Sequence, residues 1–137
     1  MSLMTNISVP MRLTPHGSLP VIAVLVNGKG PFDFIVDTGA SHLVIGEDLA
    51  TELELPGGDG LLPGMGAGGA IAPARTSLRE LRVSTAVLRD AEAGVMDLAS
   101  VSRTAEAKIS GILGYPFFAD RVITIDYPAG EFRLAEI

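Results

Sequence analysis

The chain has 137 residues, 47% of them hydrophobic, which predicts one domain with a packed core rather than a disordered chain. The sequence contains no cysteine, which excludes a disulfide scaffold, thiol catalysis and cysteine-bound zinc. Its 10 basic and 16 acidic residues give a net charge of −6, which disfavours nucleic acid and anionic membrane surfaces as partners.

The N-terminus carries a second methionine, Met4, shortly after Met1. Residues 1–3 are therefore interpreted as a cloning remnant, and 4–137 as the domain. No apolar run reaches the roughly 18 residues of a membrane-spanning helix. No signal peptide is visible either, but an upstream one could have been removed. The sequence thus predicts a soluble chain and does not distinguish a cytoplasmic from a periplasmic location.

The first third of the chain has the alternation and turn signals of short strands. Alternating residues predict a strand over 7–13, and a β-branched apolar run predicts another over 21–26. Asn27-Gly28 follows that run directly, and 32–36 then forms a second apolar run. An Asn-Gly pair between two apolar runs predicts a tight β-hairpin.

The middle of the chain predicts one strand, one helix and a glycine-rich segment. Residues 43–45 form a short β-branched run, and 46–53 has acidic residues in its first turn with leucines spaced four apart, which indicates a short helix. Pro56 ends that helix. Residues 57–69 contain seven glycines and predict a mobile loop or a hairpin tip.

The last part of the chain predicts further strands and little helix. The polar stretch 100–108 is predicted to be a loop. Many short segments between frequent turns favour an all-β barrel or sandwich with one or two short helices. The strands predicted here are 76–83, 86–96, 109–113, 122–125 and 132–134.

One carboxylate stands out by its position. Asp37 follows the apolar run Phe34-Ile35-Val36 and precedes Thr38-Gly39, so the pattern places an acid at the end of a buried strand, on a loop. Burying an ionised acid is costly unless neighbouring groups satisfy it. Asp37 could simply cap a turn, as aspartates often do.

In this setting, Asp37-Thr38-Gly39-Ala40 resembles the active-site signature of aspartic peptidases, and the later Ile112-Leu113-Gly114 resembles their second signature. A single copy in a short chain is similar to the one-domain retropepsin-like branch of bacteria and retroviruses. The resemblance covers roughly residues 5–135. The sequence departs from many bacterial relatives at Ser110, where they carry Asp, and from retroviral relatives at Ser41-His42, where acidic residues are common.

The resemblance implies a retropepsin-like closed β-barrel and a role for each matching residue. Asp37 would be the catalytic carboxylate, and Thr38 would hydrogen-bond the same loop of a partner chain. Gly39 and Ala40 would complete the active-site loop, and Ile112, Leu113 and Gly114 would support it. The flap over the cleft would comprise Met65, Gly66, Ala67, Gly68 and Gly69.

Aspartic peptidases need two carboxylates that share one proton. This sequence has one Asp-Thr-Gly and no second copy, so the resemblance implies a homodimer in which each chain supplies Asp37. The implied reaction is hydrolysis of peptide or protein substrates without a metal or cofactor. The alternative is a non-catalytic dimerisation or peptide-binding module on the same fold.

Two other readings of local motifs are rejected. The segment 64–69 matches the glycine spacing of a dinucleotide fingerprint, but Pro63 and Pro73 flank it and no helical pattern follows. Ser41 and His42 are adjacent, and adjacent residues of a strand point to opposite faces, which disfavours a serine hydrolase.

Overall fold

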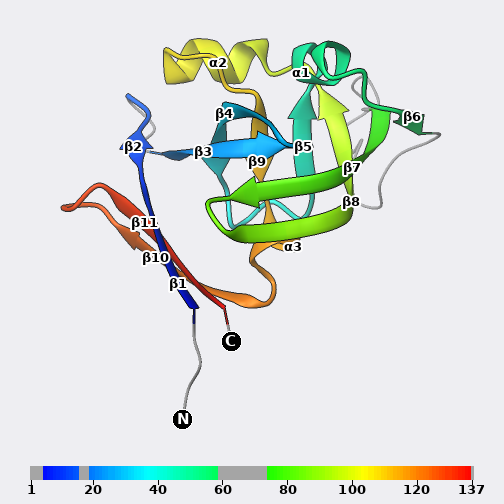
Figure 1. The fold of residues 1–137 in the computed structure, drawn as a ribbon. Coiled ribbons are helices and arrows are strands. Elements are labelled where there is room, and N and C mark those ends of the chain that lie inside the picture. The colour runs from blue at the N-terminus through cyan, green and yellow to red at the C-terminus, as the bar shows by residue number, and fades with distance from the viewer. Residues whose placement is uncertain (1–4, 16–18, 59–73, 137) are drawn as a thin grey trace.

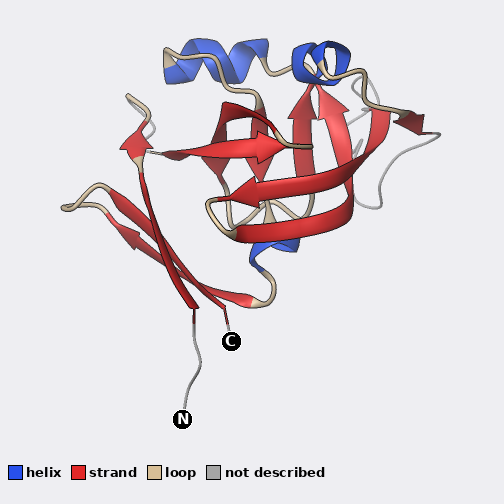
Figure 2. Ribbon diagram, in the orientation of Figure 1, coloured by secondary structure: helices blue, strands red, loops and turns tan. Residues whose placement is uncertain are grey.

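The computed structural model describes residues 5–15, 19–58 and 74–136. Within these ranges the chain is an all-β fold with three short helices, as Figures 1 and 2 show. The strands, in chain order, are β1 Thr5–Pro10, β2 Arg12–Leu13, β3 Pro20–Val26, β4 Lys29–Val36, β5 Leu43–Gly46, β6 Gly57–Gly58, β7 Ala74–Val83, β8 Ala86–Met96, β9 Gly111–Leu113, β10 Arg121–Asp126 and β11 Glu131–Glu136. The helices are α1 Glu47–Glu52, α2 Ala99–Ala105 and α3 Tyr115–Phe118.

Six strands close into a barrel. Their order is β3-β4-β9-β5-β8-β7, and β3 also pairs with β7, which joins the two ends of the sheet. Leu25 pairs with Arg82 and Val26 with Leu81 at this closure. The short strand β2 pairs with β3, and the short strand β6 pairs with β7. Closure leaves few free strand edges, and it confirms the predicted all-β barrel.

Strand β9 lies between β4 and β5, although it comes much later in the chain. It runs parallel to β4 and antiparallel to β5. Ile112 pairs with Ile35 on one side and with Val44 on the other. This insertion brings the segment around Leu113 beside the end of β4, so the topology positions the site.

Two apolar clusters hold the fold together. The larger fills the barrel and contains fully buried large side chains such as Phe34, Leu81 and Phe117. The smaller lies outside the barrel, where α2 and the segment after it pack on the outer faces of β3, β4, β5 and β9. The buried members of the smaller cluster are Val21, Ile35, Val44, Leu98, Ala105 and Ile109.

A second sheet, in the order β1-β11-β10, packs beside the barrel. Its inward residues Ile7, Phe132 and Leu134 belong to the same core cluster as the barrel interior. Phe118 of α3 contacts Phe132 edge to face at 6.0 Å between ring centroids. The chain ends are therefore tied to the barrel through one continuous core.

The predicted hairpin at Asn27-Gly28 is confirmed. Val26 pairs with Lys29 across the turn, and Asn27 and Gly28 have φ values of 52° and 78°. Two consecutive positive φ values are typical of the tight turns that match the twist of paired strands. Local turn chemistry therefore predicted this element correctly.

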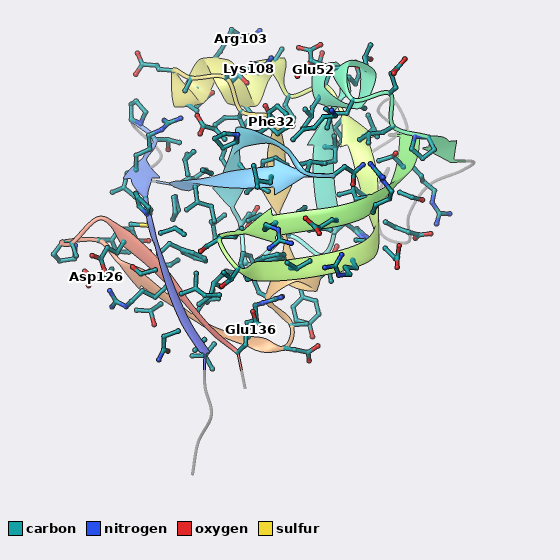
Figure 3. All side chains as sticks on the ribbon, in the orientation of Figure 1. Phe32, Glu52, Arg103, Lys108, Asp126 and Glu136 are labelled. Carbon is teal, nitrogen blue, oxygen red and sulfur yellow. The ribbon has the colours of Figure 1, made fainter. Side chains whose placement is uncertain are left out.

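Two other expectations are wrong. The strand predicted over 7–13 is divided at Met11, whose N–H donates to the Gly130 carbonyl, so β1 and β2 belong to different sheets. The loop predicted over 100–108 contains α2. Val101 and Ala105 face the outer cluster while polar side chains face solvent. Figure 3 shows Arg103 on the side of α2 that points away from the barrel.

Candidate active site

Asp37 is the first residue after β4 and opens the loop that leads to β5. Its backbone N–H donates to the Leu113 carbonyl at 3.0 Å, which continues the pairing of β4 with β9. Its carbonyl accepts from the Ala40 N–H, and its carboxylate Oδ1 accepts from the Gly39 N–H, each at 3.0 Å. These bonds fold the loop tightly and hold the carboxylate in place.

The loop around Asp37 presents its residues to solvent. Asp37, Thr38 and Gly39 are all exposed, and Ala40 is half-buried. The strand before them is fully buried at Phe34, Ile35 and Val36. An exposed carboxylate on a rigid, buried base is an arrangement suited to meeting a substrate or a second chain.

The second signature supports this loop directly. Ile112 and Leu113 lie in β9, and Gly114 follows as the residue before α3. Besides the bond from Asp37 to Leu113, the Tyr115 N–H donates to the Ala40 carbonyl at 2.8 Å. The two signatures, distant in the sequence, are thus joined by a backbone hydrogen bond on each side of Gly114.

Gly114 is at a position where no side chain fits. A Cβ added there would collide with the His42 carbonyl oxygen and would lie 2.7 Å from the Ala40 carbonyl oxygen. Both neighbours are backbone atoms, which have little room to move. The glycine of the second signature is therefore needed for the close approach of β9 to the Asp37 loop.

A buried apolar row, which the sequence did not predict, crosses the strand that leads to Asp37. Ile35, Ile112 and Val44 form a row across β4, β9 and β5, on the face covered by α2. Ile35 and Asp37 are two residues apart on an extended chain, so their side chains project to the same side. Alternation along 34–37 could have indicated this for Ile35, but the row depends on pairings that only the fold reveals.

Ser110, the departure from the second-signature pattern noted in the sequence, lies at the entrance to β9. It is 5% exposed, its N–H donates to the Asp33 carbonyl, and its carbonyl accepts from the Gly46 N–H, both at 2.8 Å. These are backbone bonds, which any residue type can make. Ser110 therefore joins β4 to β5 without a charged side chain.

The predicted flap, Met65, Gly66, Ala67, Gly68 and Gly69, lies outside the described residues. The described chain on either side is paired, with Gly57 opposite Thr76 and Gly58 opposite Arg75. The Thr76 hydroxyl also donates to the Pro56 carbonyl at 2.6 Å.

In residues 5–15, 19–58 and 74–136, no three His, Cys, Asp or Glu side chains are grouped as a metal site would need. No helix in these same ranges combines the length and the apolar character needed to cross a bilayer.

Comparisons with known proteins agree with this geometry. The sequence model of a family described as aspartyl protease matches residues 22–117, which include both signatures. A retropepsin-like aspartic protease from Rickettsia conorii is similar in structure, with a TM-score of 0.63 at 18% identity. The match covers 97% of this chain and 92% of that one, and it shows a shared fold. No curated protein matches the sequence.

Proposed function

Because the chain belongs to the aspartyl protease family, we propose that it hydrolyses peptide bonds with two copies of Asp37, one from each chain of a homodimer. The observation that carries the proposal is the single exposed Asp37 loop, tied through Leu113 and Tyr115 to the second signature. A loop held in this way can present a carboxylate in a defined direction. The retropepsin-like fold is consistent with this use.

The chemistry explains why one chain is insufficient. Two carboxyl groups about 3 Å apart cannot both be ionised, because their like charges repel, so the pair holds one proton. The ionised member accepts a proton from the attacking water, and the protonated member donates to the carbonyl oxygen of the scissile peptide bond. The chain has one Asp-Thr-Gly, and therefore the second carboxylate comes from a second copy.

The other site residues have supporting roles in this proposal. Thr38 is exposed beside Asp37, and its hydroxyl is available to bond the same loop of the partner. Gly39 donates its N–H to Asp37 Oδ1, and a Cβ at this position would lie 3.4 Å from the same oxygen, an ordinary contact distance.

The test compares the unchanged chain with Asp37→Asn in a digest of a peptide library, alongside sedimentation of both proteins. Asparagine keeps the size and hydrogen-bonding capacity of the side chain but cannot share a proton as a carboxylate does. We expect Asp37→Asn to lose at least 10²-fold in cleavage, the lower end of what a general acid or base contributes, while it remains dimeric.

The matched control is Asp48→Asn, because Asp48 is an exposed aspartate in the first turn of α1. We expect this control to keep full cleavage. Cleavage by Asp37→Asn at the unchanged rate would contradict the proposal. A dimer that binds peptides without cutting any would instead establish the non-catalytic module.

A further inference from the structure

A hollow lies where the segment after α1 faces the ribbon of β7 and β8. Its volume is about 530 Å³, and we call it the α1–ribbon hollow. Pockets that hold small organic molecules have volumes of about 300 to 1,000 Å³, so one such molecule fits here. None of the described residues that line it belongs to the Asp37 loop or to the second signature. Its lining includes Leu53, Glu54, Leu55, Leu78, Asp90 and Glu92.

Hydrogen bonds fix the walls of the α1–ribbon hollow. The segment after α1 is wound back on the helix, because the Leu55 N–H donates to the Ala50 carbonyl at 3.0 Å. The Pro56 carbonyl accepts from the Thr76 hydroxyl of β7 at 2.6 Å, which ties this segment to the ribbon. The hollow is therefore preformed in the folded chain, and an occupant does not have to order its walls.

The lining combines apolar side chains with charges of unequal number. Leu53 and Leu55 are half-buried and Leu78 is buried, so together they offer an apolar surface to an aliphatic chain. Three carboxylates line the hollow against one guanidinium, that of Arg79, which gives the lining a net charge of −2. A ligand with an aliphatic body and positive ends therefore complements this lining, whereas an anion is repelled.

Two of the three carboxylates have no cation beside them. Glu92 is paired with Arg75 at 2.7 Å. Glu54 and Asp90 are exposed, and neither has an ion pair with any residue in the part of the chain that the structure describes. Arg79 lines the same hollow without pairing to either of them. Two carboxylates are thus left for a ligand.

The backbone at these two carboxylates is unusual. Glu54 has a φ of 51° and Asp90 a φ of 53°, in the left-handed region that residues other than glycine rarely adopt. Asp90 lies inside β8, where a strand residue would ordinarily be extended. Strained conformations of this kind cluster at sites that hold ligands. The backbone therefore agrees with a binding role for both side chains.

A metal ion suits this lining less well than an organic cation. In residues 5–15, 19–58 and 74–136, no set of three His, Cys, Asp or Glu side chains could hold a metal ion. The carboxylates of the lining therefore do not converge on one point. Two positive groups joined by an aliphatic chain can meet them separately, with the chain on the apolar surface between.

We propose that the α1–ribbon hollow binds an aliphatic diamine, with one ammonium group at Glu54, the other at Asp90, and the carbon chain on the leucines. The inference does not depend on the proposed function, since the hollow shares no described residue with the Asp37 loop. It assigns to this chain a second binding site, one for small organic dications.

NMR titration of the full chain with four five-carbon compounds tests the charge and the two-ended shape of the ligand. Cadaverine (1,5-diaminopentane) carries two positive charges, pentylamine one, 1,5-pentanediol none, and glutarate two negative charges. We expect cadaverine to give saturable shifts of the Leu55, Leu78 and Ala91 signals, and pentylamine to bind about threefold more weakly. Pentanediol and glutarate should leave these signals unchanged. Added salt should weaken the binding of cadaverine, because it screens exposed charges.

Two substitutions each remove one charge and keep the shape of the side chain. Asp90→Asn suits a left-handed backbone as well as aspartate does, and Glu54→Gln is its counterpart on the other wall. Each should weaken cadaverine binding about threefold, an effect typical of an exposed ion pair, and the double variant about tenfold. Melting temperatures establish that every variant is folded.

The matched control is Glu52→Gln. Glu52 is exposed at the end of α1, two residues from Glu54, and does not line the hollow (Figure 3). This variant should bind cadaverine as the unchanged chain does.

Three results would overturn the inference: no saturable shifts with cadaverine, equal shifts with pentanediol, or an equal loss of affinity in Glu52→Gln. Equal affinity for pentylamine and cadaverine would overturn the assignment of two ammonium positions. Because peptide cleavage is not part of the readout, failure of this inference and failure of the proposed function are distinguishable.

Discussion

At the scale of single residues, the site depends on close backbone contacts more than on the character of its side chains. Asp37 is held by three hydrogen bonds, two of them made by its own backbone. Gly114 allows the approach that makes those bonds possible, because any Cβ there meets backbone oxygens. The two signatures therefore form one structural unit, and a substitution in either one should alter the geometry of both.

Gly114→Ala tests this dependence. The added methyl overlaps the His42 and Ala40 carbonyl oxygens, so the loop and β9 must separate. We expect a loss of about 1–3 kcal/mol in the free energy of unfolding, the usual range for forced overpacking, with loss of cleavage. Urea denaturation measures the first effect. Gly57→Ala is the matched control, since a Cβ there meets nothing within 4 Å. Equal stability of the two variants would contradict the account.

Two carboxylates that lie outside the candidate site have lowered pKa values, and these give an expected change of stability with pH. The pKa of Asp126 is lowered by its hydrogen bond from the Ala129 N–H and then by Arg133. The pKa of Glu80 is lowered mainly by its hydrogen bond from Arg82. A carboxylate whose pKa is lower in the folded state than in the unfolded state stabilises the fold at pH values above its unfolded-state pKa. That stability is lost as pH falls through the folded pKa.

We therefore expect the melting temperature to fall as the pH decreases from about 5 to 3. Asp126→Asn cannot titrate at this position, so its melting temperature should change less over the same interval. Scanning calorimetry at several pH values makes the comparison. Figure 3 shows Asp126 at the β10–β11 end of the second sheet. A steeper pH dependence in Asp126→Asn than in the unchanged chain would contradict the assignment.

At the scale of elements, sequence patterns predicted the turns and strands that neighbouring residues determine, and missed an element that depends on distant ones. The Asn27-Gly28 turn and its two strands were predicted, and the structure adds that Asn27 Oδ1 accepts from the Arg79 and Glu80 N–H groups. The helix α2 was missed because polar residues interrupt its short apolar face. Its contacts come from β3, β4, β5 and β9, and of these only β9 is its neighbour in the chain.

The candidate site was predictable to a similar extent. Asp37 and Ile112-Leu113-Gly114 were identified through family resemblance, and the structure brings them together. The insertion of β9 between β4 and β5 depends on long-range pairing, which no local pattern encodes. For the same reason, the contact of Ile35 with α2 and the need for glycine at 114 became visible only in the fold.

Arg121 connects three elements and offers a test at this scale. From the start of β10, its guanidinium donates to the Phe117 carbonyl of α3 at 2.5 Å and to the Val87 carbonyl of β8 at 2.9 Å. It also lies 4.5 Å from the centroid of the Phe117 ring, while its Nε is 3.7 Å from Glu136, beyond hydrogen-bond distance. This side chain therefore links the second sheet to the barrel.

Arg121→Ala should lower the free energy of unfolding by about 2–4 kcal/mol, because two charge-assisted hydrogen bonds and the contact with the Phe117 ring are lost. Arg103→Ala is the control, since that arginine is exposed on α2, and its effect should stay within about 0.5 kcal/mol. Denaturant titration compares them. If Arg121→Ala were as stable as Arg103→Ala, the link between the sheets would not depend on this side chain.

At the scale of the whole molecule, the described fold places the exposed carboxylate of Asp37 on a rigid barrel, and the proposed mechanism takes the second carboxylate of the pair from another copy. Symmetric homodimers are the commonest oligomers, and a twofold axis beside Asp37 would bring two identical loops together. In this account, a folded chain that contacts its substrate stays inactive until it associates with a second copy.

The central claim is tested most directly by mixing chains. A fixed amount of the unchanged chain is equilibrated with an equal amount of Asp37→Asn, and the rate of peptide cleavage is followed. If each site needs Asp37 from both chains, only dimers of two unchanged chains are active, and random exchange lowers the rate to about one half. A large excess of Asp37→Asn should take the rate towards zero. A rate that stays constant at every ratio, with exchange shown by mass spectrometry of the mixed dimers, would contradict the account.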